Sequence, residues 1–494
     1  MSETMNVSKG ARIEGGIDAV VIGATADAFA AAAMIARSGL HVVLIETGDR
    51  PREKREFSPG YFAVDGDPLA YALDQQVIDA LDLYRHGLSF IARRLETFVR
   101  FGDGAAMTLP GDPALAGEAV AAFSEADATR FADFLEEERK TARALSGWFS
   151  GGAAPLIPAL REIGAASFDG AVIGRFADQR LEDYLRAEVS IGAAHRSSEA
   201  YTYLALLRRL AGETAGLQGG VAAIDGGGRG LAGALRRAAQ AAGVSIRQTD
   251  RVRTVIVEWD RVAGVSFDDG GQIRAPVIVS ALSARETFID FVGKARLDIE
   301  FARLLDFPAP AIATVRAHLA LNGPIGDALV GARLDRRFLL APSAATLESA
   351  WRAAASGKAS NGVVELVFPS ALDRTLAPEG CLTAAMLLHP VAFGDPAEEV
   401  WREGIENVAR EAIRRVAPEM SAEIVAIDLD APERAAPPMF EALERRRRIT
   451  DASGLEGYFF CGPEASIGGG VSLSAGRRAG ERALRYFKEG GTNP

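Results

Sequence analysis

Only two cysteines and five histidines occur among the 494 residues. Cys381 and Cys461 cannot build a disulfide framework, so a reducing, cytoplasmic compartment is expected. The histidines are scattered and no C-x-x-C motif occurs, which predicts that the chain holds no metal. Basic residues are outnumbered by acidic ones, 55 to 66, and the net charge of −11 disfavours nucleic acid and anionic membranes as main partners.

Uninterrupted apolar runs long enough to span a membrane are also missing. The best candidate, residues 19–36, is broken by Gly23, Thr25 and Asp27, and strand–turn–helix explains it better. We therefore expect no transmembrane segment, although contact with a membrane surface stays open. The length predicts two domains or more.

What the chain does have is a strand–turn–helix–strand pattern near its start. Residues 17–22 predict a buried strand, 28–38 an alanine-rich helix that ends at Gly39, and 41–45 a second buried strand closed by Glu46. This is the layout of a dinucleotide-binding unit. The fingerprint G-x-G-x-x-G/A falls on Gly23, Thr25 and Ala28, so that its second glycine is replaced.

Two residues at this turn oppose a bound diphosphate. Thr25 places a β-branched side chain where phosphate oxygens approach the backbone. Asp27 adds a negative charge at the same helix start, which repels a diphosphate by about 1 kcal/mol. The alternative is that Asp27 caps this helix and no phosphate binds. Glu46, 23 positions after Gly23, lies near the offset expected for the acid that holds ribose hydroxyls.

The remaining chain divides by pattern. Residues 68–220 are mostly helical by pattern, and 309–433 mix alternating strands with a helix at 397–417, which indicates a second sheet with one face in solvent. Gly226–Gly230 precedes a further set of predicted elements: a helix at 231–242 and strands at 244–247, 252–258, 262–267 and 277–280. Near the end, YFFCG predicts a strand, SIGGGVS a glycine loop, and 474–488 a helix.

Three of these blocks, in this order, resemble the superfamily of FAD-dependent amine oxidases and phytoene desaturases, and most of all its phytoene-dehydrogenase-like oxidoreductases. They are the opening unit that ends in Glu46, the GGGRG–helix–meander that ends in VIVSA, and YFFCGPEASIGGGV with its helix. The resemblance implies an α/β fold with a Rossmann-like FAD-binding domain of the glutathione-reductase type and a discontinuous α+β substrate domain. It assigns 17–67, 222–300 and 440–490 to the FAD-binding domain, 68–221 to a mostly helical substrate or lid region, and 301–439 to a substrate domain with a mixed sheet.

The same resemblance implies FAD as cofactor and names the residues near it. On the adenosine and phosphate side they are Gly23, Thr25, Ala28, Glu46, Arg50 and Val252, and on the flavin and ribityl side Gly462, Glu464, Gly469, Gly470 and Val471. The family carries a glycine pair after the ribose acid, where this chain has Arg52 and Glu53. Glu464 is read either as an acceptor for a ribityl hydroxyl or as a solvated loop acid, and Cys461 as a buried, inert thiol.

Two functions follow as hypotheses. The first is an FAD-dependent oxidoreductase, of the dehydrogenase, desaturase or oxidase type, that transfers a hydride from an apolar or amine-like organic substrate to the flavin. The second is a relative without flavin that acts as a binding protein, or as the degenerate subunit of a complex with a related flavoprotein. Either could form a homodimer or a heteromer. No catalytic residue is evident; His318, in an alternating strand of the substrate half, is the first candidate, against an ordinary structural role.

Overall fold

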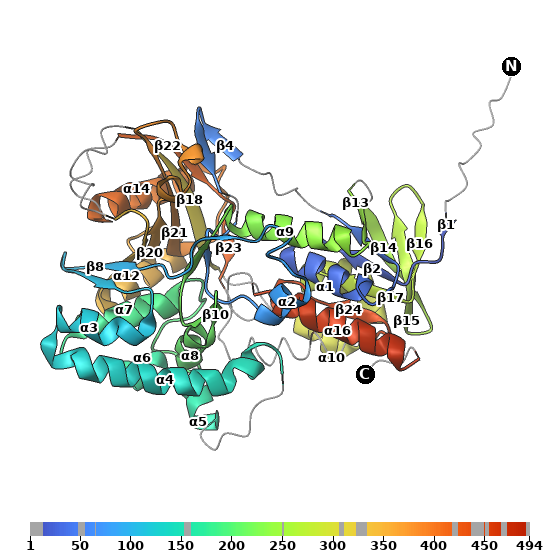
Figure 1. Cartoon of the computed structure of the whole chain (residues 1–494), viewed down its shortest axis with the longest axis horizontal. Coiled ribbons are helices and arrows are strands. Elements are labelled where there is room, and N and C mark those ends of the chain that lie inside the picture. Colours follow the sequence, from blue (N-terminus) through green and yellow to red (C-terminus); the bar gives the residue numbers. More distant parts are fainter. Residues whose placement is uncertain are drawn as a thin grey trace.

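The structure, a computed structural model, describes residues 13–47, 55–64, 66–152, 160–248, 251–305, 311–322, 333–416, 423–435, 449, 454–465 and 472–490. Segments from the start, middle and end of the chain come together on one side of the molecule in Figure 1, around helices α1, α9 and α16. The other side holds the large sheet, with α14 beside it and the helices α3–α8 below it.

The first unit is built on a five-stranded parallel sheet of order β13-β3-β2-β17-β24. Three of its strands, β2 (Ala19–Ile22), β3 (Val42–Ile45) and β17 (Val277–Ser280), are buried along their whole length. This explains why their sequences are continuous apolar runs. The outer strands are β13 (Ser245–Arg247) and β24 (Tyr458–Phe460). This sheet confirms the expected Rossmann-like α/β fold.

Helix α1 (Ala26–Ala36) packs between α9 (Gly227–Ala241) and α16 (Ser474–Lys488). The contact with α16 is close because both helices present small side chains. A Cβ on Gly476 would lie 2.3 Å from the carbonyl oxygen of Asp27, and one on Gly480 would lie 3.4 Å from the Cβ of Met34. The alanine-rich sequence of α1 thus serves a tight helix–helix contact as well as helix formation.

A meander follows β13, as the alternating pattern predicts. Strands β14 (Val252–Glu258), β15 (Arg261–Phe267) and β16 (Gln272–Arg274) form an antiparallel sheet, and β1 (Ile13–Glu14) adds to it in parallel. This sheet packs on the parallel one through buried residues such as Val265. β17 then returns the chain to the parallel sheet beside β2.

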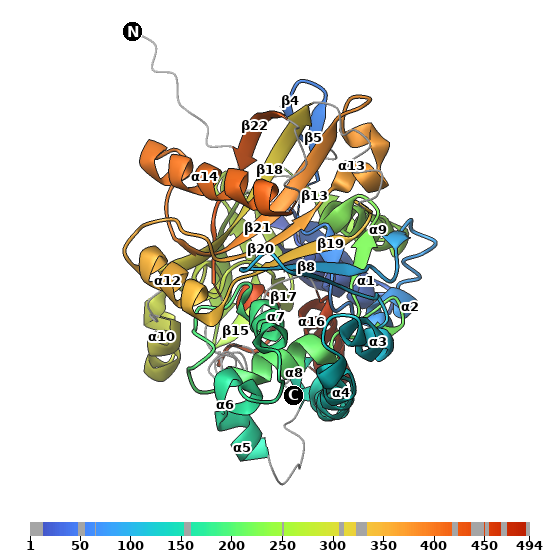
Figure 2. The same ribbon diagram turned by 90° about the vertical axis from the view of Figure 1, so that its left-hand side faces the viewer.

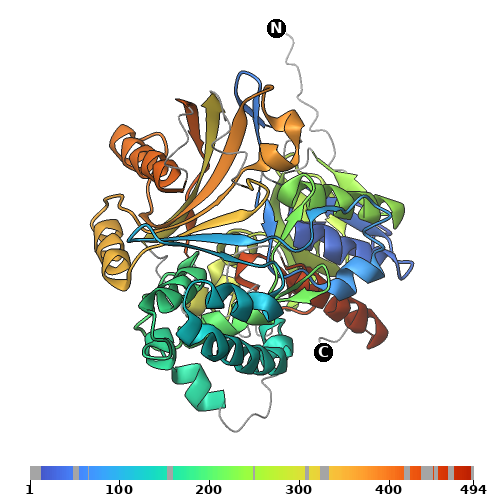
Figure 3. The same cartoon turned by 60° about the vertical axis from the view of Figure 1, so that its left-hand side comes forward.

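The second unit is built on an eight-stranded sheet. Its main path is β22-β18-β21-β20-β19-β8-β9, with β23 beside β18. Figures 2 and 3 show α14 (Glu399–Val416) over one face and the helices α3–α8 below the other. The strands are β22 (Glu423–Leu429), β18 (Ile312–Asn322), β21 (Leu382–Ala392), β20 (Val363–Val367), β19 (Arg337–Ala341), β8 (Thr97–Phe101), β9 (Ala106–Leu109) and β23 (Glu433–Arg434).

One expectation about this sheet is wrong. The alternating sequences predicted a face in solvent, yet β18 and β21 are buried on both faces over nearly their whole length. One face packs against α14 through Trp401 and Ile405. The other carries small, polar or charged side chains that are covered by the rest of the protein, so the alternation separates two buried environments and not core from water.

Residues 68–221 are less helical than their pattern predicted. Their first third forms mostly short strands. Of these, β8 joins the large sheet beside β19, more than two hundred positions later in the chain, and β9 pairs with β8. A true helical layer begins only at residue 116. The helices of this layer are α3 (Ala116–Ala121), α4 (Ala128–Phe149), α5 (Leu160–Ala165), α6 (Phe168–Val172), α7 (Gln179–Ser190) and α8 (Tyr203–Ala211).

Short elements complete the structure. They are β4 (Arg55–Ser58), β5 (Tyr61–Ala63), β6 (Leu69–Ala70), α2 (Gln75–Ala80), β7 (Phe90–Ala92), β10 (Glu213–Thr214), β11 (Leu217–Gln218), β12 (Ala222–Ile224), α10 (Ile299–Leu305), α12 (Ala344–Ala355) and α13 (Pro369–Leu372). Within the described ranges, none of the helices combines the length and the apolar character needed to cross a membrane.

Candidate functional site

Gly23 and Glu46 follow neighbouring strands of the parallel sheet. Ile22 on β2 lies opposite Ile45 on β3, and the N–H of Gly23 donates to the carbonyl of Ile45 at 2.9 Å. Gly23 adopts a φ of +132°, which favours glycine, and a Cβ there would lie 3.1 Å from Ala281. The turn and the acid named from the sequence are therefore adjacent at the carboxyl edge of the sheet, where open α/β sheets bind ligands.

Thr25 is the N-cap of α1. Its Oγ1 accepts a hydrogen bond from the N–H of Ala28 at 3.2 Å, so the hydroxyl is directed at its own helix. The N–H groups of Ala26 and Asp27 are among those that a helix start leaves without an intrahelical partner. Ala28 is fully buried, as the third fingerprint position requires. The start of α1 thus keeps donors for an anion although the second glycine is missing.

Asp27 does not cap α1, contrary to the alternative that the sequence left open. Its Oδ1 accepts a hydrogen bond from the N–H of Gly476 at 2.7 Å, in the first turn of α16. Burial raises the pKa of Asp27 to about 6, although the Gly476 N–H and the charge of Arg478 act in the opposite direction. The acid is thus directed at a second helix N-terminus, 449 positions away in the sequence, which offsets part of its charge.

Glu46 is held by an ion pair that the sequence did not reveal. Its Oε1 pairs with the guanidinium of Arg236 on α9, and the Glu46 side chain is only 8% exposed. Its Oε2 is buried and has no hydrogen-bond partner in the part of the chain that the structure describes. One carboxylate oxygen is therefore fixed and the other is left for a donor from outside, as a ribose hydroxyl would supply.

Val252 opens β14, five residues after Arg247, whose carbonyl accepts the N–H of Glu46 at 2.8 Å. It is half-buried and packs against the core of the first unit. Val252 therefore comes shortly after β13, the strand next to β3, and the family resemblance predicts an adenine on this side of the sheet. Arg50, Arg52 and Glu53 lie outside the described residues.

Gly462 and Glu464 follow β24, at the same edge of the sheet. A Cβ on Gly462 would lie 1.8 Å from the carbonyl oxygen of Leu282, so this glycine allows two chain segments to pass. Glu464 accepts a hydrogen bond from the N–H of Ala284 at 3.1 Å, a role that neither alternative from the sequence included. Cys461 is buried, and burial raises the pKa of its thiol well above the usual range, as an inert cysteine requires. Gly469, Gly470 and Val471 lie outside the described residues.

The glycine block at 226–230 serves packing. A Cβ on Gly227 would lie 2.4 Å from Val64, and one on Gly230 only 1.8 Å from the carbonyl oxygen of Asp225. The N–H of Gly228 donates to the carbonyl of Asp67 at 2.8 Å, so the first turn of α9 is capped by the protein itself.

His318 belongs to a cluster of charged residues between the two units. Its Nε2 lies 3.1 Å from Oδ2 of Asp430, and Phe57 lies against its ring. Arg55 also pairs with Asp430, at 2.8 Å, and Arg316 pairs with Asp67, next to the start of α9. Burial would raise the pKa of Asp430, but the hydrogen bond from His318 and the nearby arginines lower it. The contacts of Asp430 link β18, the end of β22 and the β4–β5 hairpin, which fits the structural alternative for His318; a role of His318 in a reaction stays a prediction.

The helical layer is joined to the large sheet by a second, buried network. Arg337 on β19 is 1% exposed and contacts Glu188 of α7 and Glu365 of β20, the latter at 2.6 Å. Arg209 of α8 also pairs with Glu188, and the hydroxyl of Tyr71 donates to Glu365. Burial alone would raise the pKa of Glu188, but Arg337 and Arg209 lower it to about 2. Within the described residues, no group of three or more potential ligand side chains could hold a metal ion.

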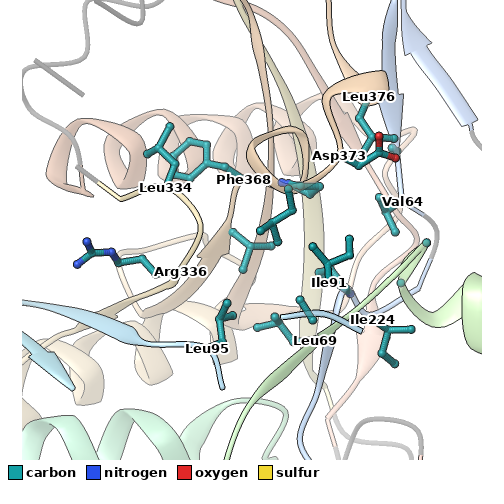
Figure 4. A pocket seen from close by; sticks show the side chains of 18 residues that line it. Val64, Leu69, Ile91, Leu95, Ile224, Leu334, Arg336, Phe368, Asp373 and Leu376 are labelled. Atoms are coloured by element: carbon teal, nitrogen blue, oxygen red, sulfur yellow. The ribbon is translucent and has the colours of Figure 1, made fainter. Parts of the chain in front are cut away.

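An apolar pocket lies between the units, where the start of α9 meets the end of β20. It encloses about 640 Å³ of space, open mouth included. Figure 4 shows mostly aliphatic side chains around it, and the guanidinium of Arg336 points away from them. Asp373, the acid in its wall, accepts hydrogen bonds from the backbone N–H and the hydroxyl of Thr375. The apolar lining includes Val64, Leu69, Leu95, Ala223, Ile224 and Phe368.

Comparison with known proteins gives a consistent result. No family model matches the chain. It is 26% identical to the mouse pyridine nucleotide-disulfide oxidoreductase domain-containing protein 2, over 97% of this chain and 95% of the relative, and 25% identical to the rat protein, over 95% and 94%. An oxidoreductase from Methanosarcina mazei aligns with a TM-score of 0.64 at 17% identity, over 95% of this chain and all of that one. A putrescine oxidase bound to putrescine aligns with a TM-score of 0.61 at 14% identity, over 97% of this chain and all of that one. Cyclohexylamine oxidase from Brevibacterium oxydans aligns with a TM-score of 0.60 at 15% identity, over 96% of this chain and 99% of that one.

The chain thus shares the fold of putrescine oxidase and cyclohexylamine oxidase, and it is similar over nearly its whole length to the two oxidoreductase-domain proteins. The curated relatives support the expectation of an oxidoreductase, and the solved structures, all below 25% identity, support the expected fold. The described residues also fit an FAD: a glycine turn, the open start of α1 and the unpartnered Oε2 of Glu46 lie together at one sheet edge. Sequence reasoning missed Arg236, and no local signal marks it, because an arginine on a polar helix face is ordinary.

Proposed function

We propose that the chain binds FAD along the carboxyl edge of the parallel sheet and oxidises an apolar organic substrate. The observation that carries this proposal is the buried Oε2 of Glu46, which has no hydrogen-bond partner among the described residues and belongs to the strand next to the Gly23 turn. A buried acceptor without a partner costs about 1–3 kcal/mol, which a bound ribose would recover. The open start of α1 supports a diphosphate at the neighbouring position.

FAD, when bound, supplies the hydride acceptor, and the protein holds and orients the reactants. Gly23 would allow the chain to turn beside the diphosphate, the first N–H groups of α1 would face its charge, and Glu46 would accept a hydrogen bond from the ribose. Asp27, which was expected from the sequence to repel a diphosphate, is directed at the N–H of Gly476 instead. The hydrogen bond of Glu464 to Ala284 holds the exits of β17 and β24 together on the flavin side.

The pocket supports an apolar substrate over an amine. Most of the wall is aliphatic, and the acid in it, Asp373, holds the backbone N–H and the hydroxyl of Thr375 with its Oδ1. Apolar lining favours a hydrocarbon portion of the substrate, at about 25 cal/mol for each Å² buried. With FAD bound, a hydride would pass from one carbon of the substrate to the flavin and a proton from the adjacent carbon to water, which leaves a C=C bond and reduced flavin.

The visible absorption spectrum of the purified protein, and of the supernatant after heat release, tests the proposal. Flavin bands that appear in both, or after incubation with FAD, are the expected result. A colourless protein that takes up no added FAD would contradict it and would favour the second hypothesis, a binding protein without flavin.

Filling the pocket tests the substrate class. Leu372→Trp, in the pocket wall, should weaken the binding of a fluorescent apolar probe at least tenfold, because the indole occupies the space of the ligand. Val400→Trp, at a position 80% exposed on α14, is the matched control. Equal probe affinity in both variants would show that the ligand binds elsewhere.

A further inference from the structure

Two adjacent residues at the end of β3 each carry a buried polar atom without a partner. They are Oε2 of Glu46 and Oγ1 of Thr47, and neither has a hydrogen-bond partner within the described ranges. Buried polar atoms in native proteins are nearly always paired, so two neighbouring exceptions need an explanation. Neither atom is in contact with water, so a ligand that reaches them forms hydrogen bonds without breaking bonds between these atoms and water.

Arg236 determines which oxygen of Glu46 is left over. Its guanidinium pairs with Oε1 and lies 6.0 Å from the ring centre of Phe29, a buried residue of α1. The ring and the ion pair hold this side chain between α1 and the sheet. The carboxylate is therefore fixed in one orientation, with Oε2 available next to Thr47.

The pair of free atoms matches a particular ligand chemistry. A carboxylate oxygen only accepts hydrogen bonds, whereas a threonine hydroxyl both donates and accepts. Two adjacent hydroxyls on a sugar satisfy this pair, since one can donate to Oε2 and the other can exchange a hydrogen bond with Oγ1. A phosphate cannot, because it offers only acceptors to the carboxylate.

We propose that Thr47 binds the ribose diol of the nucleotide directly, and that Arg236 is a positioning residue that orients Glu46 for the same diol. The inference rests on the proposed function, because the nucleotide is the FAD assigned there. It goes beyond it by adding one contact and one positioning residue at the adenosine end.

Competition with FAD by ADP and by 2′,3′-dideoxy-ADP tests this assignment, with the full-length protein and flavin fluorescence as the signal. The wild type should bind ADP more tightly than the dideoxy compound. Thr47→Val keeps the shape of the side chain and removes the hydroxyl. It should weaken the binding of ADP about fivefold, which corresponds to the loss of one hydrogen bond, and leave the binding of the dideoxy compound unchanged. Thr47→Ser should retain the preference.

Arg236→Met should reduce the preference for ADP at least tenfold, because Glu46 loses its orientation, and Arg236→Lys should recover part of it. Circular dichroism shows whether each variant is folded. If Thr47→Val and Arg236→Met weaken both ligands equally, or neither, while the wild type still binds FAD, the inference is overturned and the proposed function stands. A wild type that binds neither FAD nor ADP would overturn both.

Discussion

Replacing Asp27 by asparagine tests how the starts of α1 and α16 are held together. The wild-type carboxylate accepts the N–H of Gly476 at 2.7 Å, and an asparagine oxygen can accept the same hydrogen bond. What changes is the charge. Burial raises the pKa of Asp27 to about 6, so the folded protein binds this proton more tightly than the unfolded chain does.

The sign of the effect follows from this shift. The contribution of Asp27 to stability is fully present below the unfolded pKa and is lost as the pH rises through about 6. At pH 5, one unit below the pKa in the folded protein, this contribution makes the free energy of unfolding about 1.4 kcal/mol higher than at pH 8. Asp27→Asn has no such dependence. Between pH 5 and pH 8, the free energy of unfolding of the variant should therefore rise by about 1.4 kcal/mol relative to that of the wild type.

Urea denaturation of the cofactor-free protein at pH 5, 6, 7 and 8 measures this difference, because all other titrating groups cancel between the two proteins. Asp18→Asn is the matched control: it removes one carboxylate from the same unit, where Asp18 accepts the N–H of His41 at 2.7 Å. The free energy of unfolding of Asp27→Asn minus that of the wild type should rise with pH, and a difference that stays constant or falls from pH 5 to pH 8 would refute the reasoning.

Three further variants separate structural from functional roles. Arg337→Met leaves Glu365 without its cation and Glu188 with Arg209 alone, and it should lower the free energy of unfolding by about 3–5 kcal/mol in urea titrations; a loss below 1 kcal/mol would show that the network is dispensable. Thr25→Gly should lower the free energy of unfolding by only a few tenths of a kcal/mol, because glycine is also a good N-cap residue. It should tighten FAD binding several-fold, as measured by flavin fluorescence, and unchanged or weaker binding would count against the assigned diphosphate position. His318→Gln should lower the melting temperature and leave the pH profile of kcat unchanged, and a shifted profile would instead assign His318 to the reaction.

The sequence was sufficient for elements whose signals are local. The helix at Ser474–Lys488 has the predicted bounds, and the strands of the meander lie where the alternation and the turns placed them. Gly23 and Glu46 were paired correctly because two parallel strands joined by one helix bring their carboxyl ends together.

Contacts between distant segments could not be predicted from the same information. Asp27 looked like a cap of its own helix, since nothing near it in the chain indicates Gly476. The strand β8 was missed because its partner β19 comes more than two hundred positions later, and β9 was missed with it because it pairs with β8. His318 looked available for chemistry until Asp430, 112 positions away, was found beside its ring.

The most direct test of the central claim is a titration of the flavin-free protein with FAD. Quenching of flavin fluorescence, followed with and without ADP as competitor, gives both the stoichiometry and the adenosine dependence. The account predicts saturable binding of one FAD per chain that ADP displaces. Fluorescence that stays unchanged at every protein concentration, or FAD binding that ADP does not affect, would contradict it.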